Sequence, residues 1–378
     1  MADKKKKIWN FVFLIVVFLL TVYYIFKDQD IGKILNTAAD ADIRYLLLGI
    51  LCVILFILGE SSIIYYMMRT LGAKVKILHC ALYSFVGFFY SCITPSASGG
   101  QPMQIYYMKK DKLPIPVTTL VLMIVTITYK SVLVLVGILC AVFGHGMLLH
   151  YLGDMIWVFY LGLFLNVVCV AGMLVLAFAP GLAKKLVIGG MRLLEKMHLL
   201  KKKEERLQKL HDSMDQYHAA AEFWSDHKRI IVNVFVITVV QRFLLFTVTY
   251  WVYLSLGLSG YGFWEVTLLQ SVISVAVDML PLPGGMGISE TLYIRIFEGV
   301  FGNLLLPSML LSRGIAYYGQ MLISAVMSFV AHIVIHGDDP DSSGEMKALK
   351  LYHLRRKKEN KQEQFSGTEQ RKTGYGGE

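Results

Sequence analysis

Two proline- and glycine-rich elements interrupt the apolar stretches of this chain and constrain its fold more than any other feature. One is Pro95-Ser-Ala-Ser-Gly-Gly-Gln-Pro102, and the other is Pro281-Leu-Pro-Gly-Gly-Met-Gly287. Each follows an apolar run that is short for a bilayer crossing, and each precedes a second short run. Proline and glycine break a helix and free backbone N–H and C=O groups, which hydrocarbon cannot satisfy. A break at membrane depth must therefore be buried in protein or line a wet cavity.

The composition indicates a membrane protein and argues against several other classes. Hydrophobic residues make up 56% of the chain, charged residues 17%, and the mean hydropathy is +0.56, outside the range of soluble domains. The net charge of +10 lies almost entirely outside the apolar runs, so we attribute it to topology and anionic lipid and expect no specific nucleic-acid partner. Nucleotide-binding, hydrolase and Cys/His metal motifs are missing from the sequence. We expect no catalytic residue, no metal site and no cofactor.

The apolar runs predict an all-α integral membrane protein. The runs long enough to cross roughly 30 Å of hydrocarbon cover residues 8–26, 43–68, 114–143, 155–179, 230–256 and 307–336. The short runs form two pairs, at 77–108 and 263–301, and we predict that each pair is a re-entrant helical hairpin. The expected fold is an inverted-repeat bundle of about six full transmembrane helices and two such hairpins.

The basic residues predict the orientation, because cytoplasmic loops carry an excess of Lys and Arg. The Lys4–Lys7 cluster and the basic tail place both termini of a multi-pass cell-membrane protein in the cytoplasm. The lysines at 109–112 are cytoplasmic only if the first hairpin enters and leaves from that side. The second hairpin then enters from outside, where the flanking loops 257–262 and 302–306 carry no Lys or Arg. One hairpin from each face is the arrangement of an inverted repeat.

Ionisable residues repeat around the two Gly-Gly elements. Glu60 precedes the first element by nearly the spacing at which Arg242 precedes the second, and Lys130 and Arg313 follow them at similar spacings. The repeat and the charge distribution together divide the chain into parts. These are a first membrane half at 1–179, a basic amphipathic cytoplasmic linker at 180–229, a second membrane half at 230–336 and a basic cytoplasmic tail at 337–378.

The candidate binding residues belong to the two breaks and to the helical turns that follow them. An outgoing helix that starts near Gly287 or Ile288 would point free N–H groups into the membrane interior, where they suit a phosphate or carboxylate. Tight helix packing is the alternative explanation for the glycines and prolines. We expect the Glu290 carboxylate to meet a substrate cation or to balance Arg242 or Lys130, with a simple helix cap as the alternative. The predicted binding residues are Pro95, Ser98, Gly99, Gly100, Gln101, Gln104, Pro283, Gly284, Gly285, Gly287 and Glu290.

Charged residues inside the apolar runs predict a cavity. Lys130 and Arg242 lie near the middle of long runs, where a bare charge costs about 3 kcal/mol or more. Each should face a cavity or pair with an acid, in a functional site or in a purely structural ion pair. Arg313 lies nearer the end of its run and could instead reach the interface. The predicted cavity charges are Glu60, Lys130, Arg242, Asp278 and Arg313.

Two motifs and the long basic linker resemble a known family. Ser98-Gly-Gly-Gln-Pro-Met-Gln-Ile-Tyr106 and Leu282-Pro-Gly-Gly-Met-Gly-Ile-Ser-Glu290 are similar to the lysylphosphatidylglycerol synthase transmembrane region, also called the flippase-like family, over roughly residues 8–336. An acidic residue often follows the first Gly pair in that family, whereas Gln101 and Gln104 stand here. Members with a C-terminal aminoacyltransferase domain make lysyl-phosphatidylglycerol from charged tRNA and move it to the outer leaflet. This chain ends about 42 residues after its last predicted helix, so the resemblance implies the flippase half.

Three functions remain open from the sequence. The first is a lipid translocase that moves a polar or aminoacylated phospholipid, such as lysyl-phosphatidylglycerol, between bacterial membrane leaflets. The second is a lysyl-tRNA-dependent phosphatidylglycerol lysyltransferase, and the third is an ion-coupled transporter of another small or lipid-linked solute. The expected partners are anionic or aminoacylated phosphatidylglycerol and the anionic inner leaflet, which the linker and tail would contact. Glycine-rich helix faces leave homodimer formation open.

Overall fold

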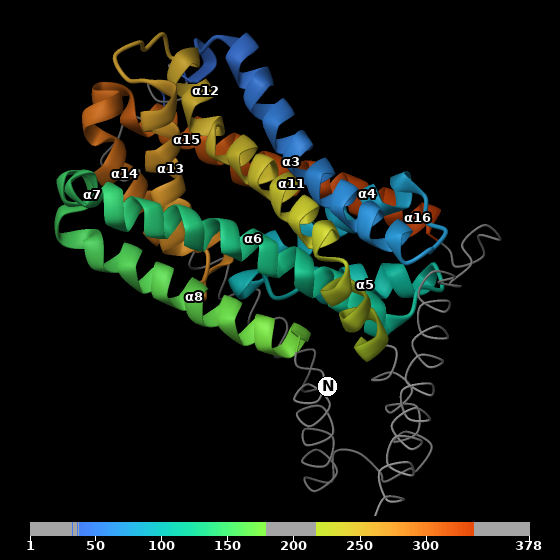
Figure 1. Ribbon diagram of the computed structural model, residues 1–378. Coiled ribbons are helices and arrows are strands. Elements are labelled where there is room, and N and C mark those ends of the chain that lie inside the picture. The colour runs from blue at the N-terminus through green and yellow to red at the C-terminus, as the bar shows by residue number, and fades with distance from the viewer. Residues whose placement is uncertain (1–31, 33–35, 37, 179–216, 336–378) are drawn as a thin grey trace, which may run out of the picture.

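In the computed structural model, which describes residues 32, 36, 38–178 and 217–335, every regular element is a helix (Figure 1). Among these residues, five helical stretches are long and apolar enough to cross a membrane: Ile43–Thr70, Ile115–Phe143, His145–Ala177, Lys228–Ser255 and Ile288–Val334. The expectation of an all-α chain with several membrane-spanning helices is confirmed. The crossing predicted at 8–26 and the tail at 337–378 lie outside the described residues.

The first half of the structure contains one broken helix. Its elements are α3 (Ile43–Thr70), α4 (Ile77–Ile93), α5 (Gly100–Lys110), α6 (Ile115–Phe143), α7 (His145–Leu152) and α8 (Ile156–Phe178). Residues 94–99, between α4 and α5, form the first break and contain the 3-10 turn η1 (Pro95–Ala97). Thr94 holds this turn, because its hydroxyl donates to Tyr90 O at 2.6 Å and accepts from the Gly99 N–H at 2.9 Å.

The second half contains the other broken helix. Its elements are α11 (Lys228–Phe246), α12 (Val248–Ser255), α13 (Phe263–Val277), α14 (Ile288–Phe301), α15 (Leu305–Arg313), the π-helical η5 (Gly314–Gly319) and α16 (Gln320–Val334). Residues 278–287, between α13 and α14, form the second break and contain the turn η3 (Pro283–Gly285). As predicted, the outgoing helix starts at Ile288.

One predicted crossing differs in detail from the structure. The run at 230–256 is divided into α11 and α12 at Thr247. The Thr247 hydroxyl donates to Leu244 O at 2.8 Å, while its backbone N–H still donates to Phe243 O at 3.0 Å. The side chain therefore competes locally for a helix carbonyl without ending the helical path.

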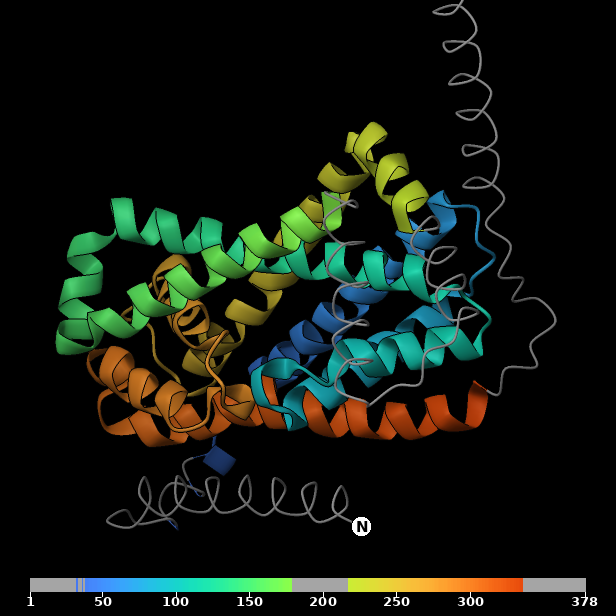
Figure 2. The ribbon, with the colours of Figure 1, turned by 90° about the horizontal axis from the view of Figure 1, so that it is seen from below.

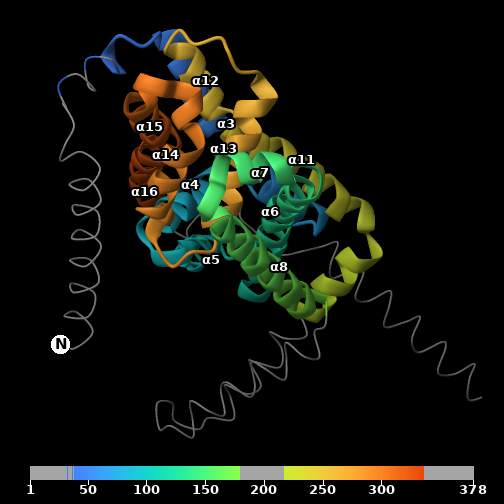
Figure 3. The same ribbon diagram turned by 90° about the vertical axis from the view of Figure 1, so that its left-hand side faces the viewer.

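The two breaks meet in the interior of the bundle. Turn η1 contacts η3, and the incoming arm α4 packs against α3 and α16 (Figure 2). The other incoming arm, α13, packs against α6 and α8, and α3 packs along α11 and α12. Figure 3 views the bundle from the end that carries α7 and α14, where α13 lies near the middle of the surrounding helices. The arrangement brings both breaks to one central region.

The end of the predicted linker docks onto the bundle. Residues 217–226 are helical, and Ala220 and Trp224 are fully buried in a cluster that also contains Met67 and Leu120. The Tyr217 hydroxyl donates to Leu176 O at 2.9 Å, which ties this segment to α8. The part of the linker for which the sequence predicts an amphipathic helix lies outside the described residues.

The outer faces of the long helices are apolar. Large exposed hydrophobic side chains recur at helical spacing on α11 and α16: Val232, Val236, Val240, Leu322, Val326, Phe329 and Ile333. Continuous apolar surface of this kind suits a hydrocarbon surrounding and would be a liability in water. The polar and charged groups described next lie instead inside the bundle.

Candidate functional site

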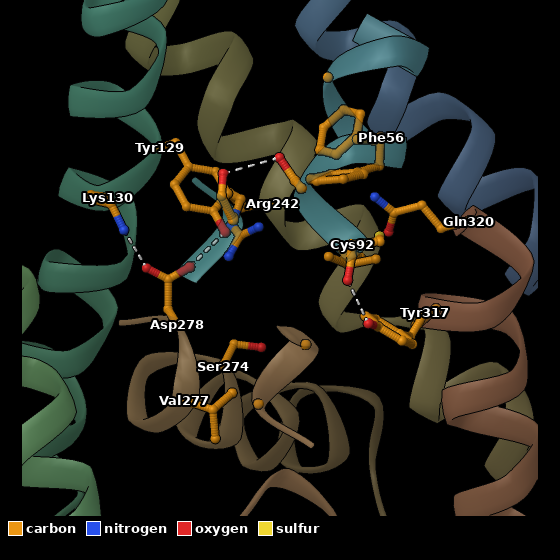
Figure 4. A pocket seen from close by; sticks show the side chains of 18 of the residues that line it. Phe56, Cys92, Tyr129, Lys130, Arg242, Ser274, Val277, Asp278, Tyr317 and Gln320 are labelled. Carbon is orange, nitrogen blue, oxygen red and sulfur yellow. Dashed lines mark hydrogen bonds and ion pairs between the residues drawn. The ribbon is translucent and has the colours of Figure 1, made fainter. Parts of the chain in front are cut away.

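A cavity of about 490 Å³ lies between the two breaks (Figure 4). Both halves of the chain line it, the first with residues from α3, α4, α5 and α6 and the second with residues from α11, α13, η3, α14, α15 and η5. Ten residues singled out by sequence belong to its wall: Glu60, Ser98, Gln101, Gln104, Lys130, Arg242, Asp278, Gly284, Gly285 and Arg313. The structure thus brings together all five predicted cavity charges.

One ion pair joins the two halves across the cavity. Lys130, near the middle of α6, places Nζ 2.6 Å from Oδ2 of Asp278, which directly follows α13. The Tyr129 hydroxyl donates to the other oxygen, Oδ1, at 2.7 Å. Figure 4 shows Asp278 between these two side chains. The pairing of Lys130 with an acid agrees with the sequence expectation, and both carboxylate oxygens are engaged.

A second ion pair lies beside the second break. Arg313 Nη2 lies 2.9 Å from Glu290 Oε1, and it also donates to Gly284 O at 3.2 Å. Oε2 of Glu290 accepts from the Gly287 N–H at 2.7 Å and from the Ser289 hydroxyl at 2.9 Å. Glu290 is therefore a helix cap and an ion-pair partner at once.

These contacts bear on two expectations about the second break. Of the alternatives given for Glu290, the helix cap is present, the cation that it balances is Arg313 at the end of α15 in place of Arg242 or Lys130, and a substrate cation stays a prediction. The N-terminus of α14 was expected to offer free N–H groups to an anion, and one of the groups there, the Gly287 N–H, already donates to Glu290 of the same helix in a capping contact. The anion site itself stays a prediction.

Arg242 is buried near the middle of the α11–α12 crossing without an acidic partner. Its side chain is 3% exposed, and within the described part of the chain no carboxylate lies within 4.0 Å. Its guanidinium carbon lies 3.8 Å from the centroid of the Tyr129 ring and 5.4 Å from that of Phe246. Cation–π contact with desolvated rings offsets part of the cost of burying the charge. Arg242 was expected to face a cavity or to pair with an acid, and the structure has the first of these, because Arg242 lines the cavity while Asp278 pairs with Lys130.

Glu60 is the complementary case, a carboxylate with no cation beside it. It lies on α3, and Oε1 accepts from Nε2 of Gln104 at 2.6 Å. Among the described residues, no Lys, Arg or His nitrogen lies within 4.0 Å of it. The neighbouring Gln101 donates to the Thr126 hydroxyl of α6. The two glutamines of the first break are thus anchored to the helices around them.

Two tyrosines that the sequence analysis did not select complete the wall. Tyr129 connects the Lys130 pair to Arg242. The Tyr317 hydroxyl donates to Cys92 O at 2.8 Å, while Gly284 lies so close that a Cβ there would be 2.2 Å from the Tyr317 ring (Figure 4). An aromatic residue next to, or one turn from, an intramembrane cation would have been the signal for both.

The remaining predicted binding residues serve the breaks themselves. Pro95, Gly99, Gly100, Gly287 and Glu290 are not part of the cavity wall, and Pro283 lies in the turn η3. A Cβ at Gly100 would lie 2.6 Å from Gly87 O, so this glycine lets α5 approach α4 closely. Within the described residues, no group of three or more His, Cys, Asp or Glu side chains could hold a metal ion.

Comparison with known proteins agrees with these features. A search of curated proteins finds no match to the chain. The family model described as the lysylphosphatidylglycerol synthase TM region matches residues 10–324, which include every wall residue named above. That family concerns membrane proteins that handle lysyl-phosphatidylglycerol. The chain belongs to the family of the lysylphosphatidylglycerol synthase transmembrane region.

Proposed function

We propose that this protein is a phospholipid translocase of the cell membrane that moves a polar or aminoacylated lipid, such as lysyl-phosphatidylglycerol, between leaflets. One observation carries the proposal: a cavity of about 490 Å³ with five charged side chains lies among helices whose outer faces are apolar. Charges inside a membrane are expensive and mark substrate pathways. A headgroup would cross through the cavity while its acyl chains stay in the hydrocarbon.

Two re-entrant hairpins related by an inverted repeat form the proposed frame. Three sets of matching contacts support it. The incoming arm α4 packs on α16, and the incoming arm α13 packs on α6 in the same way. The outgoing arm α5 packs on α6, the outgoing arm α14 packs on α15, and the turns η1 and η3 contact each other. Each incoming arm therefore packs on the crossing that follows the other break. Transporters with inverted repeats place their substrate site where such broken helices meet.

The charge distribution supports an orientation with the first hairpin entering from the cytoplasm and both termini on that side. Arg69 lies in the last turn of α3, and Lys109 and Lys110 lie in the last turn of α5. Leu71 and Met108, beside these residues, share one buried cluster, so the basic residues gather at one end of the bundle. The loops 257–262 and 302–306, without Lys or Arg, would lie outside.

A reconstituted assay tests the proposal directly. The full chain would be placed in liposomes that contain lysyl-phosphatidylglycerol with a fluorescent group on one acyl chain, and dithionite would quench the outer leaflet. We expect the protein to make the inner-leaflet pool accessible, Arg242→Gln to abolish this, and Glu298→Gln on the exposed face of α14 to behave as wild type. Quenching no faster than in protein-free liposomes would overturn the proposal.

A second assay separates transport from synthesis. The purified protein would be incubated with lysyl-tRNA and phosphatidylglycerol, and the lipid fraction would be analysed by mass spectrometry. We expect no lysyl-lipid. Formation of that product would identify a lysyltransferase, the alternative that the family name raises.

A further inference from the structure

Equal numbers of basic and acidic side chains surround the cavity, but not all of them form ion pairs. Three cations and three acids lie in its wall or next to it: Lys130, Arg242, Arg313, Glu60, Asp278 and Glu290. Two ion pairs, at 2.6 and 2.9 Å, neutralise four of them. The remaining two, one cation and one acid, line the same cavity, and no ion pair within 4.0 Å joins them. Within the part of the chain that the structure describes, one cation and one acid of the interior are therefore left without an ion-pair partner.

Arg242 has the properties of a phosphate-binding group. Its guanidinium is held against the Tyr129 ring, and Tyr129 is itself fixed by its hydrogen bond to Asp278. The Nε–H of Arg242 has no hydrogen-bond partner within the described residues, although it is buried. A planar guanidinium with an unused donor matches the oxygens of a phosphodiester better than an ammonium would.

Glu60 has the properties of an ammonium-binding group. Gln104, which is 4% exposed, donates to Oε1 and so fixes the carboxylate. The helices that carry Glu60 and Arg242 pack together, because Gln241 donates to Phe56 O at 2.9 Å, one turn before the acid. The two uncompensated groups thus lie on neighbouring helices at a fixed separation.

We propose that Arg242 and Glu60 form a two-part headgroup site that selects phospholipids with both a phosphate and an ammonium group. The phosphodiester would bind Arg242 and the ammonium would bind Glu60. This inference rests on the proposed lipid translocase and narrows its substrate to amine-bearing lipids over purely anionic ones. A ligand with both charges neutralises the cavity, whereas a simple anion leaves the Glu60 carboxylate unpaired beside it.

The test compares two lipids that differ by the ammonium group. Liposomes would hold the full-length protein with phosphatidylethanolamine or phosphatidylglycerol, each labelled on an acyl chain, in the dithionite assay. We expect Glu60→Gln to slow phosphatidylethanolamine movement about tenfold or more, the range of a lost charge-assisted hydrogen bond, and not to slow phosphatidylglycerol. Arg242→Gln should slow both lipids, because both carry the phosphodiester. Glu298→Gln, an exposed acid on α14, is the matched control and should change neither rate.

The other outcomes show whether the two-part site or the proposed translocase itself is wrong. If wild type moves none of the labelled lipids, the translocase itself is wrong. If wild type moves lipid but Glu60→Gln slows both lipids equally or neither, the two-part site is wrong and the translocase stands. Equal slowing together with a dependence on an imposed proton gradient would make Glu60 a coupling group instead. Uptake of labelled glycerophosphoethanolamine without lipid movement would assign the site to a soluble substrate and overturn the lipid proposal.

Discussion

The two breaks share a Gly-Gly pair but need glycine for different physical reasons. In the second break, Gly284 and Gly285 have φ of 59° and 65°, in the left-handed region that other residues rarely adopt. In the first break, Gly99 has φ of −82°, and Gly100 begins an ordinary helix against Gly87 O. One pair sets the backbone path and the other permits close packing. Similar motifs in two halves of a chain therefore do not imply similar tolerance to substitution.

The polar contacts at the two breaks also differ in kind. The second break is held by charge, through Arg313 and Glu290. The first is held by neutral amides, with Gln101 on Thr126 and Gln104 on Glu60. Because the first break supplies no charge of its own, it leaves Glu60 with an amide partner and no cation. The predictions below test this contrast.

The largest effect should come from splitting the ion pair of the second break. Arg313→Gln leaves the buried Glu290 without its cation, and we expect the free energy of unfolding in SDS to fall by about 3–5 kcal/mol. The double variant with Glu290→Gln should recover much of this loss, because no buried charge then remains. Gln101→Leu in the first break should cost clearly less. Equal losses at both breaks would contradict the contrast between charge and amide.

A bulky residue at the second Gly-Gly pair should have the next largest effect. At Gly285 a side chain must adopt φ of 65°, and its Cβ would lie 2.8 Å from Val277 Cβ. Left-handed backbone and overpacking together predict a loss of about 2–5 kcal/mol for Gly285→Leu. Gly299→Leu is the control, since nothing lies within 4 Å of a Cβ there. A stable Gly285→Leu protein would show that the turn is not constrained as described.

A smaller effect is expected from disturbing the packing of α4 against α5, the two helices that flank the first break. A Cβ at Gly87 would lie 2.4 Å from Gln104 Nε2, so Gly87→Ala must displace the amide from Glu60. We expect a loss of about 1–3 kcal/mol in SDS unfolding. Shortening the neighbour with Gln104→Ala removes the clash, so the double variant should lose less than the two single losses added together. Additive losses would argue against close approach as the reason for this glycine.

Sequence patterns located the charges of the cavity but not their partners. Spacing from the Gly-Gly elements was enough to select Lys130 and Arg313, the position just before the second break selected Asp278, and all three line the wall. Partner choice depends on helix rotation and depth, which a linear pattern does not contain. The sequence therefore did not indicate that Glu290 pairs with Arg313 or that Arg242 lies against the Tyr129 ring.

Helix positions were predicted better than helix irregularities. Long apolar runs and the prolines and glycines between them placed the start of α14 at Ile288 and the two breaks where the structure has them. The interruption at Thr247 and the π-helical turn at Gly314–Gly319 were missed. Both depend on which backbone carbonyl a local donor reaches, and many sequences with the same apolar pattern would form a regular helix there.

The smallest effect is expected from removing the hydrogen bond between the Tyr317 hydroxyl and Cys92 O. Its hydroxyl reaches Cys92 O, at the end of the first incoming arm, while its ring packs on Gly284 of the second break. Tyr317→Phe keeps the ring and removes the bond, so we expect a loss of about 1 kcal/mol in SDS unfolding. Tyr106→Phe, at a half-exposed tyrosine on α5, should change nothing. If Tyr317→Phe is equally silent, the hydrogen bond to Cys92 O does not stabilise the fold, and the packing of the ring on Gly284 is what Tyr317 contributes.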